Sequence, residues 1–347
     1  MSRRQRAAPV AARHRRRAWA FAALCVACLL IPVGYVAGRA RPGAAADQPA
    51  GGQTLAALRG RPALLFRSLV PGDGFGALAA IPLDEPERER TITQLRCDRV
   101  HFAGGRGLCL SNHIAAFWSP PTAQAFDLDL HELASFPVPE LPSRARVAPD
   151  GQHAAMTHFV RGDSYNDSGF STRTALLDLA AGSPLGDLEQ FAVWREGARF
   201  QAPDFNFWGV TFARDGNRFY ATLASGGTTY LVEGDLAARS VRTLRENVEC
   251  PSLSPDNRRI AFKKRVSPEA WRLHVLDLDT MAESPLAEER SVDDQAEWLD
   301  DDQVLYGLTE QSPTGTSTNV WVVPVEGEGA PRIFVPLASS PAVVRSG

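Results

Sequence analysis

Side chains that could bind a metal ion occur in four acidic clusters of the chain. They are Asp293-Asp294, Asp300-Asp301-Asp302, Glu233 with Asp235, and Asp163 with Asn166 and Asp167. Ca²⁺ prefers carboxylate and amide oxygens, but none of these clusters has the spacing of a defined calcium loop. We interpret them as solvated carboxylates of turns, with a Ca²⁺ site as the alternative. No metal ligand and no cofactor is assigned.

Motifs for covalent or metal-assisted catalysis are absent from the sequence. It has no G-x-S-x-G nucleophile elbow, no H-E-x-x-H pair and no phosphate-binding glycine loop. The histidines from residue 101 onward are scattered without the spacing of metal ligands, and we interpret them as surface or core side chains. We therefore assign no catalytic residue and expect a protein that is not an enzyme.

Two short segments could form a binding surface. The aromatic segment contains Phe205, Asn206 and Trp208, and it would rim a pocket where a strand begins. The basic segment contains Lys263 and Lys264, and it would contact a partner or an anionic polymer. The alternatives are that Trp208 packs between sheets, which we favour for that residue, and that the lysines mark a solvated strand end.

A repeated unit of two short strands joined by a tight turn must position these residues. Its clearest copy spans residues 253–262, and the turn residues of four copies are Asp150, Asp215, Asp256 and Asp301. A turn aspartate accepts hydrogen bonds from backbone N–H groups two residues further on, and a following Gly or Asn tolerates positive φ. We assign these four aspartates a structural role.

The repeats have the spacing of propeller blades. With two weaker copies at Gly60 and Gly105, the intervals between turns are 45, 45, 65, 41 and 45 residues. A period of 41–45 residues is typical of four-stranded blades, and two further strands are predicted after most turn pairs, with residues 191–194 as the outer strand of the third blade. We predict an all-β, six-bladed propeller over residues 54–337, an insertion around 161–169, and a tail at 338–347.

The best repeat also resembles a known family. Ser254-Pro255-Asp256 followed by Ile260-Ala261-Phe262 resembles the PD40, or WD40-like, repeat of TolB-type propellers, and the repeats cover about residues 55–337. Segments 206–212 and 249–264 are similar to actinobacterial membrane-anchored TolB-like proteins. The resemblance implies a scaffold in the cell envelope that mostly binds proteins. The chain has no room for TolB's N-terminal α/β domain, so TolB's role in outer-membrane maintenance is not carried over.

The first fifty residues predict a membrane anchor. Residues 1–17 are a basic tail, residues 18–38 are apolar enough to span a bilayer, and residues 39–53 are a linker. Seven arginines precede the span and two follow it, which predicts a cytoplasmic N-terminus and an exported body. The alternative is a signal peptide cleaved near Ala46, which would release a secreted protein.

The body is acidic and carries three cysteines. Residues 47–347 have 28 basic and 40 acidic side chains, which argues against a nucleic-acid partner. Cys97 and Cys109 flank one strand-turn-strand unit and could form a disulfide that persists outside the cytoplasm, with Cys250 left over. Three buried free thiols are the alternative.

Together these features predict a monomeric, membrane-anchored binding propeller. It would dock an envelope protein, a peptide or a cell-wall component. The alternative is a metal-dependent propeller enzyme of the lactonase or lyase type with its site in the central channel. That enzyme would need three or four acidic, Asn or His side chains converging at the channel mouth.

Overall fold

The computed structural model describes Cys28 and residues 54–112, 121–167, 169–312, 315–326 and 329–345. The predicted basic tail, membrane span and linker, residues 1–53, lie outside the described residues apart from Cys28. No helix within the described ranges is long and apolar enough to cross a membrane. The described elements are two 3₁₀ helices, η1 (Leu55–Leu58) and η2 (Leu188–Gln190), and 26 strands.

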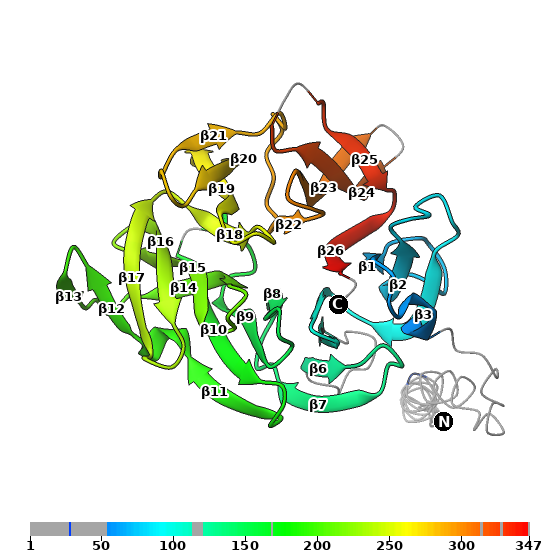
Figure 1. The fold of residues 1–347 in the computed structure, drawn as a ribbon, viewed down its shortest axis with the longest axis horizontal. Coiled ribbons are helices and arrows are strands. Elements are labelled where there is room, and N and C mark those ends of the chain that lie inside the picture. The colour runs from blue at the N-terminus through cyan, green and yellow to red at the C-terminus, as the bar shows by residue number, and fades with distance from the viewer. Residues whose placement is uncertain are drawn as a thin grey trace, which may run out of the picture. The chain divides into compact units, whose positions relative to one another are not determined.

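Six sheets surround a common axis, as the repeat spacing predicts (Figure 1). The first blade, from its innermost strand outward, contains β26 (Ala338–Val344), β1 (Ala63–Ser68), β2 (Ala77–Pro82) and β3 (Thr91–Arg96). The second contains β4 (Arg99–Ala103), β5 (Arg106–Ser111), β6 (Thr122–Phe126) and β7 (Glu132–Pro137). The third contains β8 (Pro142–Val147), β9 (His153–Arg161), β10 (Ser171–Asp178) and β11 (Ser183–Asp187).

The other three blades repeat this order. The fourth contains β14 (Asn206–Phe212), β15 (Arg218–Ser225), β16 (Thr228–Asp235) and β17 (Ser240–Glu246), with β12 (Ala192–Arg195) and β13 (Ala198–Phe200) added outside. The fifth contains β18 (Glu249–Leu253), β19 (Arg259–Ser267), β20 (Ala270–Asp277) and β21 (Glu283–Pro285). The sixth contains β22 (Glu297–Trp298), β23 (Gln303–Ser312), β24 (Gly315–Pro324) and β25 (Arg332–Val335).

The last strand closes the ring. β26 pairs antiparallel with β1, with Leu64 opposite Val343. The prediction that residues 338–347 form a tail is therefore wrong. The unit that begins at Gly60 has no first strand of its own, so without β26 the strand β1 would expose its hydrogen-bonding edge.

The 65-residue interval between the turns at Asp150 and Asp215 contains a second insertion, the strands β12 and β13, besides the predicted one. Residues 191–194, predicted as the outer strand of the third blade, instead form most of β12, which pairs in parallel with β17 of the fourth blade. β11 takes the outer position of the third blade. Packing decides this placement, because Phe191 lies edge-on to Phe219 of β15 at 6.2 Å between ring centroids.

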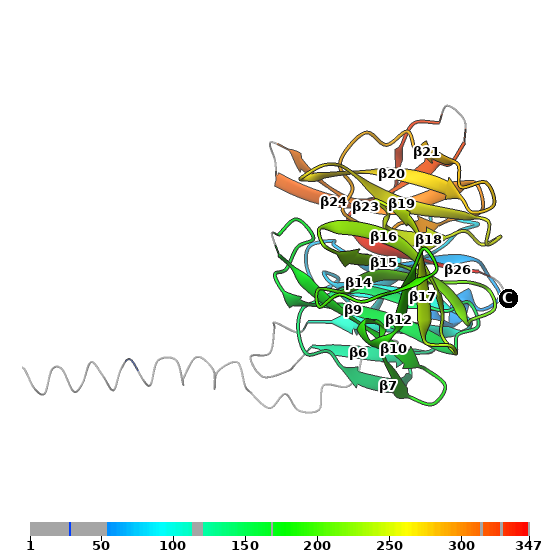
Figure 2. The ribbon, with the colours of Figure 1, turned by 90° about the vertical axis from the view of Figure 1, so that its left-hand side faces the viewer.

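Apolar side chains fill the space between neighbouring sheets. Every residue of the inner strand β14 is buried, whereas the outer strands β7 and β17 leave exposed residues along their length. The turns between the first and second strands of the blades lie at one end of the axis, which we call the turn face. The hairpins between the second and third strands lie at the other end, the loop face, and the C-terminus marks the turn face in Figure 2.

One disulfide joins Cys97, in the connection between the first two blades, to Cys109 of β5. The structure thus selects one of the two alternatives that the sequence left open. Cys250 is a buried free thiol in β18.

Candidate functional site

The turn aspartates lie at the turn face and bond within their own turns. Asp150, Asp215 and Asp256 each accept a hydrogen bond from the backbone N–H two residues further on, at 2.9, 2.9 and 3.0 Å. The last repeat differs, because Asp300 accepts this bond, at 2.8 Å. Asp301 accepts from the N–H of Asp256 in the neighbouring blade at 3.1 Å. The role predicted for Asp301 as a turn former is therefore corrected to a contact between blades.

Further contacts join neighbouring turns in the same way. The N–H of Arg214 donates to the side chain of Asn257 at 2.9 Å, and its guanidinium donates to the Pro255 carbonyl at 2.6 Å. No spacing rule reveals such contacts, because each partner belongs to a different repeat.

The predicted binding surface is largely buried. Trp208 and Lys263 have exposed fractions of 1% and 0%. Trp208 packs against Tyr165 at 5.4 Å between ring centroids. Lys263 lies over the rings of Tyr165 and Trp271, at 5.0 and 4.3 Å from their centroids. The prediction that these two residues belong to a binding surface is wrong, and Trp208 packs between blades.

The other three residues of that surface also have partners. Asn206 is 8% exposed, and its side-chain oxygen accepts from the N–H of Thr172 at 2.6 Å. Phe205 is partly buried against the apolar core of the fourth blade. Lys264 forms an ion pair with Glu283. The five residues therefore do not converge on one site.

A buried ion pair closes the central channel. Arg146 of β8 and Glu297 of β22 belong to opposite blades, and their side chains form a hydrogen-bonded ion pair across the axis. His101 of β4 lies 3.0 Å from Arg146 and 3.6 Å from Glu297, measured from Nε2. The N–H of Val343 donates to Glu297 at 3.2 Å. Four blades thus meet at the cluster of Arg146, Glu297, His101 and Val343, which we call the waist.

The groups of the waist are held in fixed charge states. Burial alone would raise the pKa of Glu297, but Arg146 and His101 hold it well below its usual range. Burial and the charge of Arg146 lower the pKa of His101, so its ring is neutral. The N–H of Val147 donates to Nδ1 of His101 at 3.0 Å. No sequence motif reveals this cluster, because Arg146 is 45 residues from His101 and 151 residues from Glu297.

The waist forms the floor of a pocket at the turn face, which we call the turn-face pocket. Its volume is about 570 Å³. Its walls are mainly apolar and include Leu58, Phe102, Leu128, Phe212, Trp298 and Val344. Pro149, Pro255 and Asn257, from the turns of the repeats, also line it. It is a blind, apolar funnel with a polar floor.

A second pocket, the loop-face pocket, opens where the inner strands begin. It has a volume of about 480 Å³, and its charged lining includes Arg67, Arg99, Arg144, Asp98, Asp293 and Asp294. Most of these charges form pairs: Arg67 with Asp98 at 3.1 Å, and Arg99 with Asp294 at 3.3 Å. Asp293 accepts a hydrogen bond from Lys263. The acidic cluster Asp293-Asp294 therefore faces cationic side chains.

The other acidic clusters of the sequence lie elsewhere and are engaged in turns or ion pairs. Glu233 pairs with Arg242 on the outer part of the fourth blade. Asp167 accepts from the N–H of Asp163 at 3.1 Å within their own loop. Asp300 closes its turn, as described above. The clusters do not converge.

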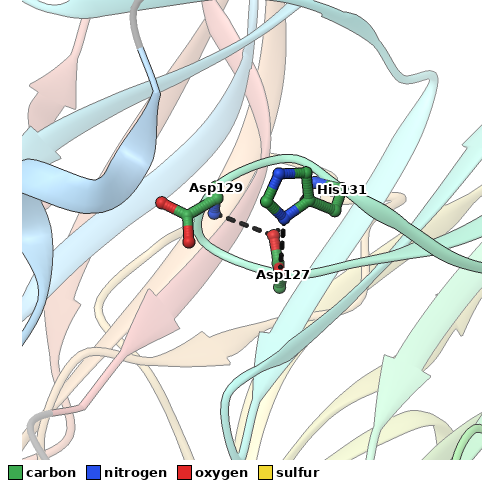
Figure 3. Close-up of side chains that lie close together, drawn as sticks. All are labelled: Asp127, Asp129 and His131. Carbon is green, nitrogen blue, oxygen red and sulfur yellow. Dashed lines mark hydrogen bonds and ion pairs between the residues drawn. The ribbon is translucent and has the colours of Figure 1, made fainter.

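Within the described residues, a group of side chains with metal-ligand geometry lies outside the acidic clusters considered from the sequence. Asp127, Asp129 and His131 lie in the turn between β6 and β7, with ligand atoms within 4.8 Å of one another (Figure 3). Their D-x-D-x-H spacing was the available signal. Asp127 accepts from the N–H of Asp129 at 2.8 Å and lies 3.1 Å from the His131 ring, while Asp129 pairs with Arg59. These contacts explain why the three side chains lie close together, because they stabilise an exposed turn.

Comparisons with known proteins identify the fold. Neither a protein-family model nor a curated protein matches the chain. TolB from Acinetobacter baumannii matches at 15% identity and a TM-score of 0.54, over 82% of this chain and 67% of that one. A putative TolB from Agrobacterium tumefaciens matches at 12% identity and a TM-score of 0.50, over 80% and 90%. A chain of a nidogen–laminin complex matches at 11% and 0.51, over 82% and 99%. The protein has the TolB-like, six-bladed propeller fold.

Proposed function

We propose that this protein is a non-enzymatic binding propeller that docks an envelope protein or peptide in the turn-face pocket. The blind, apolar funnel above the waist carries this proposal. Its walls offer buried apolar surface to a ligand, and its turns surround the mouth on a rigid scaffold. A TolB-like propeller suits a binding or scaffold role in general.

The chemistry of the floor favours binding over catalysis. A general base needs a free acceptor near its substrate, and a metal site needs unpaired carboxylates that converge. Glu297 and Arg146 neutralise each other, and Nδ1 of neutral His101 accepts the Val147 N–H. These contacts weigh against the alternative of a metal-dependent channel enzyme.

The proposal places the propeller outside the cytoplasm, held at the membrane by residues 18–38. The arginine distribution and the apolar run of the sequence support this placement. The Cys97–Cys109 disulfide supports it independently, because such bonds persist in oxidising compartments.

Site-specific photo-crosslinking in cells tests the proposed docking site. A photoreactive amino acid is placed at Leu128 and, separately, at Asn257, which line the turn-face pocket from different blades. We expect both positions to yield the same protein adduct. The control position is Leu133, which is 45% exposed on the outer strand β7 and should yield none. Different adducts from the two pocket positions, or the same adduct from Leu133, would refute the proposed site.

A further inference from the structure

The charged side chains that line the turn-face pocket are mostly cationic. Its described lining contains one acid, Glu297, and four arginines: Arg61, Arg146, Arg214 and Arg345. The body as a whole has the opposite balance, with 28 basic and 40 acidic side chains over residues 47–347. The pocket is therefore a positively charged cavity in an acidic protein.

Two of the four arginines are neutralised by carboxylates. Arg146 forms the buried ion pair with Glu297 at the floor of the pocket. Arg61 pairs with Asp84 at 2.7 Å and with Glu85 at 3.1 Å, and neither of these acids lines the pocket. The positive charge that remains belongs to the other two arginines.

Arg214 and Arg345 are held against the wall of the pocket by backbone carbonyls. Nη2 of Arg214 donates to the Pro255 carbonyl at 2.6 Å, and Nη2 of Arg345 donates to the Trp298 carbonyl. Both side chains are exposed, and within the described residues neither has a carboxylate at hydrogen-bond distance. Glu297 lies 4.0 Å from Nη1 of Arg345, but it is already bonded at the waist. The other N–H groups of the two guanidiniums can therefore donate to a ligand.

The turn aspartates do not supply the missing carboxylates. All four accept hydrogen bonds from backbone N–H groups of the turns, and none of them lines the pocket: Asp150, Asp215, Asp256 and Asp301. Water screens charges on the surface, so these acids weaken the long-range field of the pocket more than the contacts made inside it. A ligand that touches Arg214 or Arg345 therefore meets a cation that lacks a carboxylate partner among the described residues.

The two arginines come from opposite sides of the ring. Arg345 follows β26 of the first blade, and Arg214 follows β14 of the fourth blade (Figure 1). The apolar walls of the funnel line the same pocket. A guanidinium binds a carboxylate through paired hydrogen bonds, and apolar walls gain from the burial of hydrocarbon. A peptide that carries a carboxylate beside large apolar side chains supplies both, whereas an anionic sugar polymer supplies only the charge.

We propose that the turn-face pocket binds an acidic peptide segment of its partner, with Arg214 and Arg345 as the side chains that bind its carboxylates. This inference rests on the function proposed above and names the chemistry of the ligand. The apolar side chains of the segment fill the funnel, and its Asp or Glu side chains contact the two arginines. Electrostatic complementarity of this kind contributes more to the selection of a partner than to the affinity for it.

Peptide display on the purified full chain tests the chemistry of the ligand. The probe is a random peptide library, and each selected peptide is then made with a photoreactive group whose adduct is located by mass spectrometry. Peptides that crosslink to lining residues such as Leu128 or Asn257 are the pocket binders. We expect the pocket binders to contain Asp and Glu at about twice the frequency of the unselected library or more.

The outcomes of the selection separate the two proposals. If no selected peptide crosslinks in the pocket, the docking site and the acidic ligand are both refuted. Pocket binders without the enrichment in Asp and Glu would overturn the acidic ligand alone and leave the docking site standing.

Variants assign the charge preference to the two arginines. An acidic pocket binder should bind R214Q/R345Q about threefold to tenfold more weakly than it binds the unmodified protein. Its counterpart with Asn and Gln in place of Asp and Glu should bind both proteins about equally. R258Q is the control and should leave binding unchanged, because Arg258 belongs to a turn of the same face, is exposed and does not line the pocket.

Unaltered binding of the acidic peptide by the double variant would overturn the proposal. If the double variant does not fold, the two peptides are compared on the unmodified protein. Equal affinity for the acidic peptide and its Asn and Gln counterpart would then overturn the proposal, and weaker binding of the counterpart would support it.

Discussion

At the scale of single residues, the interior of this propeller depends on how charges are paired. A buried ion pair repays its desolvation only when its geometry is good, and removal of one partner leaves an uncompensated charge. Arg146 and Glu297 meet this condition because they are hydrogen-bonded to each other, His101 lies close to both, and the N–H of Val343 donates to Glu297. The waist therefore holds opposite blades together through specific charged and hydrogen-bonded contacts.

Glu189 gives a pH-dependent prediction at this scale. It lies in η2 and accepts a hydrogen bond from the N–H of Thr174 at 3.1 Å, and burial raises its pKa from 4.5 to about 7. Its folded-state pKa exceeds the unfolded value, so this stability contribution is present below about pH 4.5 and is lost as the pH rises through about 7. We expect the free energy of unfolding to fall by about 1–3 kcal/mol more in the unmodified protein than in E189Q between pH 5 and pH 8.

Urea denaturation at the two pH values measures this difference. E87Q, which removes an exposed carboxylate, is the control and should behave like the unmodified protein. An E189Q variant with the same pH dependence as the unmodified protein would show that Glu189 does not carry the effect.

At the scale of elements, three inner strands share an irregularity. Gly209 of β14, Cys250 of β18 and Ser340 of β26 have positive φ angles of 64°, 49° and 53°. The pairing register of each strand with its neighbour shifts at this point. A bulge bends the inner strand, which allows it to follow the narrow channel. Non-glycine residues rarely adopt this conformation, so the strain at Cys250 and Ser340 is offset by the surrounding packing.

Gly209 tests the importance of this bulge. A Cβ at Gly209 would lie 2.6 Å from Cα of Cys250 in the next blade, so neither backbone has room to accept it. We expect G209A to lower the free energy of unfolding by about 2–4 kcal/mol. The matched control is G226A, which has a φ of 60° but open space around its Cβ, and should cost about 1 kcal/mol.

G209A and G226A both carry the cost of positive φ. The difference between their losses in the free energy of unfolding therefore measures the cost of the close approach between neighbouring blades. Equal losses in thermal or chemical denaturation would mean that the inner strands separate easily and that the clash is relieved at no cost.

At the scale of the whole molecule, the ring is closed by strands from the two ends of the propeller. β26 completes the first blade, and its Val343 also contacts Glu297 of the sixth blade. Each blade buries its apolar faces against two neighbours, so an open ring would expose two of them.

Truncation tests this closure. A chain that ends at Leu337 loses β26, exposes the edge of β1 and removes one contact of the waist, so we expect it to lose cooperative thermal unfolding and to aggregate. A chain that ends at Arg345 keeps β26 and should melt like the full protein. An unchanged melting temperature for the shorter chain would contradict closure by this strand.

The fold could be predicted from the sequence, whereas the sites could not. The turn aspartates and the 41–45-residue period predict six blades because they are local, repeated signals. The strand at residues 191–194 was assigned to the wrong blade, since its pattern does not show which sheet its apolar side chains contact. Lys263 was interpreted as a surface residue because a lysine in sequence gives no sign of an aromatic and acidic enclosure.

By itself, the sequence determined the all-β class, the number of blades and the chemistry of most turns. These properties follow from residues that lie close together along the chain. The tertiary structure alone decided that β26 closes the ring and that Arg146 and Glu297 block the channel. Each of these depends on side chains or strands from different blades, whose meeting is fixed by the closure of the ring.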